Sequence, residues 1–527
     1  MSAQCDVFIM GAGLAGISAA CNIRNKSVIL ASGTAIASGA SFYPGTWGLG
    51  VIGPENKEDE ADLSQTIQSI GCEMCDPKLV DTLVSSITKQ IENLHDLHLP
   101  FQEVHEIKQK EFIPCFDHKQ RSWNGLLTNA ARAHFKHHID QCAVKQLPYH
   151  EVVDIIMNEN AVSGVVVLDR NNSLQYIGCN TIIIASGGMG GLFQYRLTPN
   201  DNHAMGQYLA LQCGASLINI EFNQMMTGFL PPLSAIFNEK LYEYTRFRYQ
   251  HNTLFTQEQD KLKQRSTYGP FTSRLASKDI DITLYNIFKE DSNGITIQHD
   301  PALAKSPVEF IQTYRLWLEE HKHSRLEDKK QIGVFYHASN GGIRIDTNAY
   351  TGVKGLYACG EASGGMHGAD RLGGMASANA LVFGSIAGEQ ASRYHPLNES
   401  VKTIEYHSVC YEHADLYLEQ VRAILFQNVM VVKNATGLRK AYRELEDITK
   451  KLVLTDSVDY HTHITSYHLR AALTLGKAMI QACELRKESR GSHYREDYPT
   501  CDHHMDRPIL VTGKDRPHVQ FQKKKVG

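Results

Sequence analysis

A histidine and an arginine lie in two glycine-rich stretches that follow each other closely along the chain. His337 begins the stretch "HASNGGIRID", and Arg371 lies in "HGADRLGG". An arginine guanidinium can hold a carboxylate through two parallel hydrogen bonds, and a histidine can donate a third. Taken alone, His337 is more simply explained as a core histidine, so the surrounding elements must decide whether the two residues share a ligand.

The amino-terminal segment carries a second chemical signal. The stretch "DVFIMGAGLAGISAACNI" predicts a buried strand over residues 6–10, a tight turn and a helix of small residues. Gly11, Gly13 and Gly16 match the G-x-G-x-x-G pattern, whose glycines permit a sharp turn, the approach of a pyrophosphate and close helix packing. The start of the helix would offer free N–H groups to the phosphates. This pattern alone is weak evidence, because an ordinary strand–helix turn can carry the same glycines.

Three further glycine-rich segments favour one extended cofactor. "SFYPGTWGLG" starts at Ser41, a predicted strand at Thr181–Ile184 runs into "ASGG", and "GLYACGEA" places Gly360 and Glu361 at the end of another strand. Contacts spread so widely along a chain are typical of FAD rather than of a nicotinamide cofactor. The second strand, "SVILAS", ends at Ser32, where this type of fold often has an acidic residue for a ribose hydroxyl.

The bulk composition is that of a soluble globular enzyme. With 527 residues the chain is long enough for two or three domains, and its net charge of −4 gives no basic excess for nucleic acid. No stretch approaches the roughly 18 apolar residues of a membrane span, and no secretory signal is recognisable. We therefore expect a cytoplasmic protein. Of the 12 cysteines only Cys72 and Cys75 form a close pair, so we expect neither structural zinc nor an iron–sulfur cluster and assign no metal.

Changes in composition along the chain predict that one domain is built from two separate stretches of sequence. Residues 1–222 and 335–397 would form the cofactor-binding domain, and the polar and aromatic residues 223–334 an inserted domain. Residues 398–490 place apolar side chains at helical spacing and would form a helical domain. Residues 491–527 read as a charged, turn-rich tail.

With these motifs in this order, the chain resembles the flavoproteins of the fumarate reductase, succinate dehydrogenase and L-aspartate oxidase family over nearly its whole length. The resemblance rests on "GAGLAG", "SFYPGTWG", "IIIASGGMGGLF", "HASNGGIRIDTNAYTGVKGLYACGEA", "HGADRLGG" and "ESRGSHYREDYP". It implies an α/β fold, with a Rossmann-like FAD-binding domain interrupted by a capping α+β domain and followed by a C-terminal helical domain. It also implies an FAD-dependent oxidoreductase that moves a hydride between the flavin and a small carboxylate. Such an enzyme either reduces an activated C=C bond or oxidises a CH–CH or CH–NH group.

The same resemblance implies catalytic roles for four residues. His337 and Arg371 match the pair that holds the substrate carboxylate. The family's proton-carrying arginine aligns with Lys278 in "LASKDIDITLY", and Arg274 lies one helical turn earlier, so either cation could carry the proton. A family histidine is replaced by methionine in "EFNQMMTGF", and a thioether donates no hydrogen bond.

The resemblance further implies a set of FAD-contacting residues. These are Gly11, Ala12, Gly13, Ala15, Gly16, Ser32, Ser41, Phe42, Gly45, Val153, Ala185, Ser186, Gly187, Gly360, Glu361, Arg371, Ser377 and Leu381. Residues 1–94 contain no histidine, so a histidyl link near "SFYPGTWG" is impossible and FAD is expected to bind noncovalently. A redox partner protein or a diffusible electron acceptor would complete the cycle. The alternative is a flavin-containing electron-transfer subunit of a larger redox complex, which the missing histidine and the substituted arginine also fit.

Overall fold

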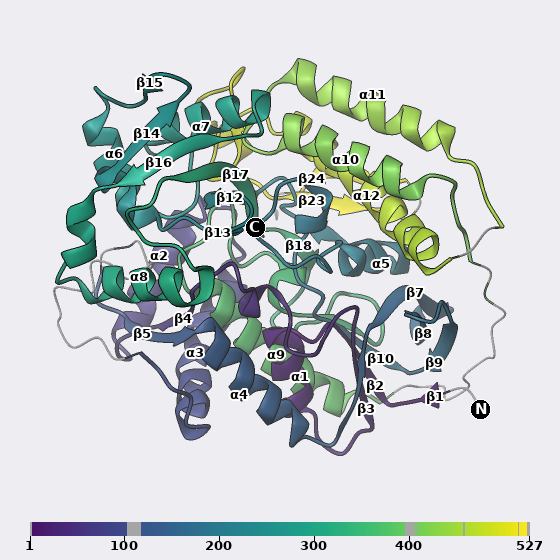
Figure 1. Ribbon diagram of the computed structural model, residues 1–527. Helices are drawn as coiled ribbons and strands as arrows, with labels where there is room; N and C mark the ends of the chain where they lie inside the picture. The colour runs from purple at the N-terminus through teal and green to yellow at the C-terminus, as the bar shows by residue number, and fades with distance from the viewer. Residues whose placement is uncertain are drawn as a thin grey trace.

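The computed structural model has an α/β fold with a parallel sheet at its centre, as predicted (Figure 1). It describes residues 3–102, 117, 119–395, 406, 408–456, 459–514 and 516–523. The central sheet has five strands in the order β19-β10-β2-β3-β6, all parallel. Their bounds are Leu356–Ala358 (β19), Thr181–Ile184 (β10), Val7–Met10 (β2), Val28–Ser32 (β3) and Val144–Pro148 (β6). The four strands predicted above are thus present as β2, β3, β10 and β19, and β2 starts one residue later than predicted.

Helices cover this sheet because its central strands are apolar along their whole length. Every residue of β2 and β10 is buried, which is the pattern of a strand with both faces covered. Helix α1 (Leu14–Asn22) follows β2 directly and packs along α9 (Met375–Arg393), and the two lie side by side in Figure 1. A second sheet, of four strands in the order β1-β9-β8-β7, stands next to the first. Its bounds are Ala3–Gln4 (β1), Leu174–Gly178 (β9), Ala161–Asp169 (β8) and His150–Asn158 (β7).

The inserted segment builds a separate, antiparallel sheet at the upper left of Figure 1. Its six strands follow the order β13-β12-β17-β16-β14-β15. Their bounds are Ala235–Ile236, Asn223–Phe229, Lys330–Ser339, Ile295–His299, Thr245–Tyr249 and Asn252–Thr253. Helices α6 (Gln259–Ser266), α7 (Lys278–Glu290) and α8 (Glu309–Lys322) belong to the same segment. The boundary predicted between residues 334 and 335 falls inside β17, and the domain limits remain predictions.

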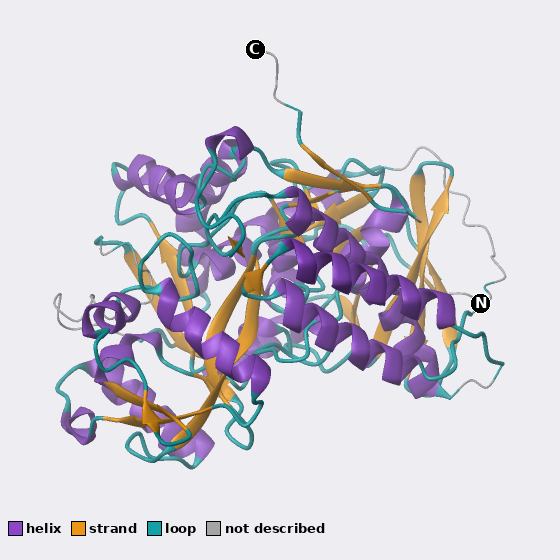
Figure 2. Ribbon diagram, turned by 90° about the horizontal axis from the view of Figure 1, so that it is seen from above, coloured by secondary structure: helices purple, strands orange, loops and turns teal. Residues whose placement is uncertain are grey.

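Helices α10 (Ala414–Val429), α11 (Ala435–Lys451) and α12 (Tyr460–Leu485) pack on one another. Seen from above, they are the long helices at the right of centre in Figure 2. In α11 the buried residues Leu438, Ala441, Leu445 and Ile448 form one apolar stripe. The predicted limit between residues 397 and 398 lies outside the described residues.

The predicted tail returns to the body of the protein. Its strands β23 (Ile509–Thr512) and β24 (His518–Phe521) extend a five-stranded sheet in the order β20-β18-β11-β23-β24. The other strands of that sheet are Ser363–Gly364, Gly342–Arg344 and Leu217–Ile218. The remaining elements are α2 (Asp59–Ile70), α3 (Pro77–Asp96), α4 (Thr128–Asp140), α5 (Met205–Cys213), β4 (Gly48–Gly53), β5 (Ser122–Leu127), β21 (Val432–Lys433) and β22 (Tyr494–Arg495). Within the described part of the chain, no helix has both the length and the apolar character needed to cross a membrane.

A buried cluster of ion pairs joins the C-terminal helices to the cofactor-binding part. Arg486 directly follows α12; its Nε donates to Glu221 Oε1 over 2.9 Å and its Nη1 to Glu488 Oε1 over 2.8 Å. All three side chains are fully buried. Arg490 donates two further hydrogen bonds to Glu488. Because a buried charge is stable only when it is paired, these contacts fix how the helical part sits on the rest.

Replacing Arg486 by methionine should destabilise the protein strongly, because it leaves the carboxylates of Glu221 and Glu488 buried with fewer partners. Breaking a buried pair in this way costs about 3–5 kcal/mol. We expect a clearly lower midpoint of urea unfolding, followed by circular dichroism. The matched control is Arg439→Met, which removes an exposed pair with Glu484 and should leave the midpoint unchanged. Equal midpoints for the two variants would contradict the anchoring role.

Candidate functional site

A cavity of ≈ 350 Å³ runs along the carboxyl ends of the parallel strands. Met10, Ala31 and Ala185, at the ends of β2, β3 and β10, line it, and so does Arg371. Pro270 of the inserted segment also contributes to the wall, so the cavity lies between that segment and the central sheet. Open α/β folds bind their ligands at this edge of the sheet.

Glycine shapes the turn between β2 and α1. Gly11 has a φ of 109°, and a Cβ there would lie 2.4 Å from the carbonyl oxygen of Ala185. A Cβ on Gly16 would lie 1.9 Å from the carbonyl oxygen of Gly11, so the helix can pack on the turn only because residue 16 has no side chain. Leu14 and Ala15, which begin α1, line the cavity, and no side chain caps this end of the helix. Its free N–H groups can therefore bind phosphate oxygens.

Most of the predicted cofactor residues reach the cavity. Those that line it are Gly11, Ala12, Gly13, Ala15, Ser32, Ser41, Ala185, Ser186, Gly187, Glu361, Arg371 and Ser377. Those that do not are Gly16, Phe42, Gly45, Val153, Gly360 and Leu381. Each residue of the second group is next in sequence to a lining residue, so it supports the wall without forming it.

An acidic side chain reaches the end of β3 from another strand. The hydroxyl of Ser32 donates to the carbonyl of Ala35 over 3.3 Å and lines the cavity. Glu151 of β7 lines the cavity too, and its Oε2 lies 3.3 Å from the position that a Cβ of Gly33 would take. The Oε1 atom of Glu151 forms a hydrogen bond of 2.5 Å with His468 Nε2 of α12. Glu151 thus places a carboxylate near the end of β3, where the sequence has Ser32 instead of an acidic residue.

Two histidines share a second part of the wall with Arg371. His337 of β17 and His367 line the cavity, as Arg371 does. Burial, together with the charge of Arg371, lowers the pKa of each histidine to about 3. Both imidazoles are therefore neutral near pH 7, and each has one N–H to donate. Burial lowers the pKa of Arg371 itself, and the carboxylates of Glu361 and Asp370 oppose this effect, so the guanidinium stays charged.

Asp370 is the buried anchor of the turn that carries Arg371. Its Oδ2 accepts hydrogen bonds from Tyr268 Oη (3.0 Å) and Arg274 Nη2 (3.5 Å). Its Oδ1 accepts from Gln224 Nε2 (3.3 Å) and from the backbone N–H of Arg371 (3.1 Å). Tyr268, Arg274 and Gln224 all belong to the inserted segment, so one carboxylate joins that segment to the arginine turn.

The C-terminal motif "ESRGSHYREDYP" also contacts the turn that carries Arg371. Ser492 donates both its N–H and its hydroxyl to the carbonyl oxygen of Ala369, each over 3.0 Å. Asn340 Nδ2 donates to the same oxygen over 3.2 Å. Gly491 accepts the N–H of Ser273, which precedes Arg274. Residues far apart in the sequence therefore converge on this turn.

Of the two cations predicted for proton transfer, Arg274 lies in this network. Its Nη2 donates to Tyr268 Oη over 2.8 Å, and its side chain is 31% exposed. Buried Arg265 fixes the loop by donating to the carbonyls of Tyr268 and Gly269, and Gly269 lines the cavity. Lys278 is the first residue of α7 and does not line the cavity; Arg274 does not line it either.

Several buried polar atoms at the cavity wall have no hydrogen-bond partner among the described residues. They include Ser186 Oγ, Asn202 Oδ1, His337 Nδ1, His367 Nδ1 and Arg371 Nε. Buried polar groups normally have partners, so these atoms can bind a polar ligand. With the phosphate-binding turn at Gly11, they fit a long ligand such as FAD, whose pyrophosphate and several polar groups need separate contacts.

Sequence reasoning did not assign four residues of this site: Glu151, Asp201, Tyr268 and His367. Asp201 lines the cavity, and its carboxylate accepts a hydrogen bond from Thr34. His367 stands inside the motif "HGADRLGG", so its place in that motif was an available signal. Tyr268 precedes the turn-forming Gly-Pro pair, which is a weak signal. Glu151 and Asp201 carry none, because only the fold brings them to the end of β3.

Comparison with known proteins accounts for nearly the whole chain. The FAD binding domain family matches residues 6–238 and 257–376, and the fumarate reductase flavoprotein C-terminal family matches residues 418–526. The fumarate reductase (CoM/CoB) of Methanothermobacter marburgensis has a chain that is 25% identical over 558 residues, with 98% of both chains covered. The L-aspartate oxidase of Saccharolobus solfataricus is 24% identical over 500 residues and covers 94% of this chain and 96% of its own.

A solved structure has the same fold. Mycobacterium smegmatis Sdh1 in complex with UQ1 matches with a TM-score of 0.84 and 18% identity, over 100% of this chain and 95% of that chain. The two family matches cover well over half of the chain, and the cavity has the glycine turn and polar wall that FAD requires. The protein is therefore an FAD-dependent oxidoreductase, a divergent member of the flavoprotein family that contains fumarate reductase, succinate dehydrogenase and L-aspartate oxidase.

Proposed function

We propose that this oxidoreductase acts on a small molecule through its carboxylate group, which Arg371 and His337 hold. The observation that carries the proposal is the pair of unpartnered buried atoms, Arg371 Nε and His337 Nδ1, on the described wall of one cavity. A buried guanidinium with an unpartnered Nε favours an anionic ligand, and its planar fork matches a carboxylate. The proposal gains support from relatives whose names include fumarate reductase and L-aspartate oxidase.

The residues of this chain would bind and orient the substrate. FAD, when bound, supplies the hydride chemistry at a carbon next to the carboxylate. Arg371 and His337 would stabilise the negative charge that develops on the carboxylate side of the substrate, an effect of roughly 3–4 kcal/mol per donor in comparable sites. Met226 lines the cavity. It lies in the segment in which the family carries a histidine, so an apolar side chain takes the place of one polar contact. The substrate would therefore carry fewer polar groups on that side than a simple dicarboxylate.

We infer that Arg274 rather than Lys278 carries the proton. Tyr268 Oη accepts from Arg274 and donates to Asp370, so the two residues hold the guanidinium in place, and a proton that Arg274 gives up would be replaced from solvent. Partial exposure of Arg274 gives the network access to water. Lys278 is the first residue of α7, and its side chain makes none of the hydrogen bonds of this network.

FAD is proposed to be bound noncovalently. Residues 41–50 contribute Ser41 and the stretch from Thr46 to Gly50 to the wall and contain no histidine. A partner protein or a diffusible acceptor would exchange electrons with the flavin. The competing function, an electron-transfer subunit that converts no small molecule, is favoured by the apolar Met226 in the cavity.

Replacing Arg371 by alanine should abolish carboxylate binding but not FAD binding. Truncating one partner of a buried charge pair costs about 2–5 kcal/mol, so affinity should fall by a factor between about 30 and several thousand. We would titrate fumarate, succinate and L-aspartate, along with unsaturated monocarboxylates, into the protein and follow the flavin absorbance. Acid precipitation should release the same amount of FAD from the variant and the wild type.

The control for this experiment is Arg344→Ala, an exposed arginine on β18, which should bind as the wild type does. Normal carboxylate binding by Arg371→Ala would exclude the proposed clamp. If no carboxylate perturbs or reoxidises the flavin of the wild type, the electron-transfer role becomes the better account. Flavin that stays with the acid pellet would contradict noncovalent binding.

Arg274→Met should slow turnover with little change in KM. A positioned proton carrier contributes roughly 10²–10⁴-fold to kcat, and it acts in the transition state rather than in binding. Lys278→Met is the matched control and should keep the wild-type rate. Steady-state kinetics with the carboxylate found by titration would show which of the two cations carries the proton. A slow Lys278→Met and a normal Arg274→Met would assign the role to Lys278 instead.

A further inference from the structure

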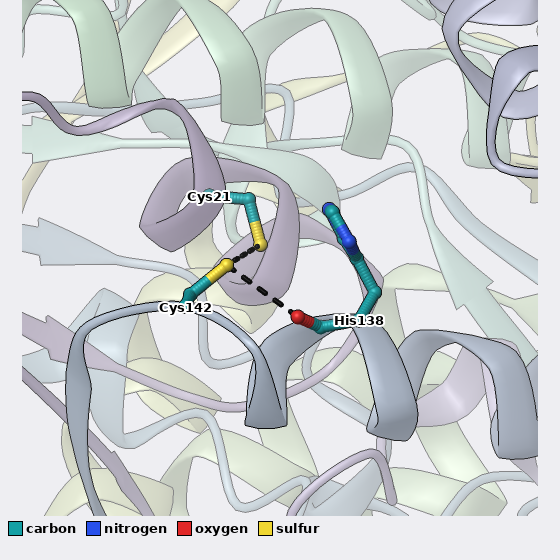
Figure 3. Close-up of side chains that lie close together, drawn as sticks. All are labelled: Cys21, His138 and Cys142. Carbon is teal, nitrogen blue, oxygen red and sulfur yellow. Dashed lines mark hydrogen bonds between the residues drawn. The ribbon is translucent and has the colours of Figure 1, made fainter.

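Two cysteines and a histidine gather at a place that the cavity does not reach (Figure 3). Cys21, His138 and Cys142 each offer one ligand atom, and these three atoms all lie within 4.8 Å of one another. None of the three residues lines the cavity. All three side chains are partly exposed, so water and ions can reach them.

The cluster arises from the packing of two helices. Cys21 lies in the last turn of α1, and His138 lies in the last turn of α4, two residues before that helix ends. Cys142 follows α4 and is four residues after His138, so the two share one side of the chain. Helices α1 and α4 are in contact, which brings Cys21 within reach of Cys142, 121 positions later.

The two sulfurs lie near each other but must separate slightly to share an ion. The two Sγ atoms lie 3.0 Å apart, and Cys142 Sγ also donates to the carbonyl oxygen of His138 over 3.5 Å. Tetrahedral zinc holds thiolate sulfurs at about 2.3 Å, which places two of them roughly 3.8 Å apart. Small rotations of the two cysteine side chains would open that space.

We propose that Cys21, His138 and Cys142 bind one thiophilic divalent cation of the Zn²⁺ type, with water as the fourth ligand. Two thiolates and one imidazole form a recognised zinc ligand set. Both S–H bonds are lost on binding, and two protons leave for solvent while no electron is transferred. The cation would hold the C-terminal end of α1, the helix that follows the Gly11 turn, against α4. The inference does not depend on the substrate proposed above.

A metal binds the thiolate and not the thiol, so each bound ion should release about two protons, and the affinity should rise with pH.

The test is zinc uptake by the reduced FAD-bound protein. We would equilibrate it with buffered Zn²⁺ and a competing chelator and measure the bound metal by mass spectrometry. We expect about one equivalent in the wild type and an affinity at least about 100-fold lower in Cys142→Ser, Cys21→Ser and His138→Ala. Addition of Zn²⁺ should also raise the melting temperature of the wild type and not of these variants.

Two matched controls should bind zinc as the wild type does. Cys5→Ser breaks another interacting cysteine pair, with Cys179, and His137→Ala removes the exposed neighbour of His138. Zinc uptake that Cys5→Ser or His137→Ala lowers as much as Cys142→Ser does would overturn the site. A wild type that takes up no zinc would overturn it as well. A loss of two hydrogens from its intact mass on treatment with peroxide, abolished by Cys21→Ser but not by Cys5→Ser, would then assign Cys21 and Cys142 to a disulfide.

Discussion

The position of Arg371 depends on one buried carboxylate. The side chain of Asp370 is fully shielded from solvent, and such a charge is costly unless several donors surround it. Its donors include three side chains of the inserted segment, those of Tyr268, Arg274 and Gln224. The cavity wall near Arg371 therefore exists only when the inserted segment is docked against the cofactor-binding part.

In the proposed mechanism Asp370 would serve two functions, because it contacts both Arg371 and Arg274. On one side Asp370 fixes the backbone of Arg371, whose guanidinium faces the cavity. On the other side it pairs with Arg274, which is partly exposed and bonded to Tyr268. The proposed anion clamp and the proposed proton carrier would thus lie close together, each cation keeping its own partners. Burial of Asp370 raises the pKa of its carboxyl, while the charge of Arg274 and three hydrogen bonds oppose this effect.

Patterns local in sequence predicted most of the fold. The apolar run Thr181–Ile184 and the glycine turn at Gly11 need no distant residue to be recognised, and both are present. Groups that meet only through tertiary contacts were not predictable in this way. Glu151 reaches the end of β3 because β6 pairs with β3 and leads into β7. The proposal that Arg274 rather than Lys278 carries the proton depends on a loop that buried Arg265 holds in place, and no spacing in the sequence predicts that loop.

A double-mutant cycle between Asp370→Asn and Arg274→Met tests the central claim most directly. Asparagine keeps the shape of Asp370 but removes its charge, so FAD content should stay normal in both variants. If Asp370 positions Arg274 for proton transfer, the two losses in kcat should overlap, with a coupling of about 1–3 kcal/mol. Independent losses that simply add would show that Asp370 and Arg274 act separately and would contradict the account.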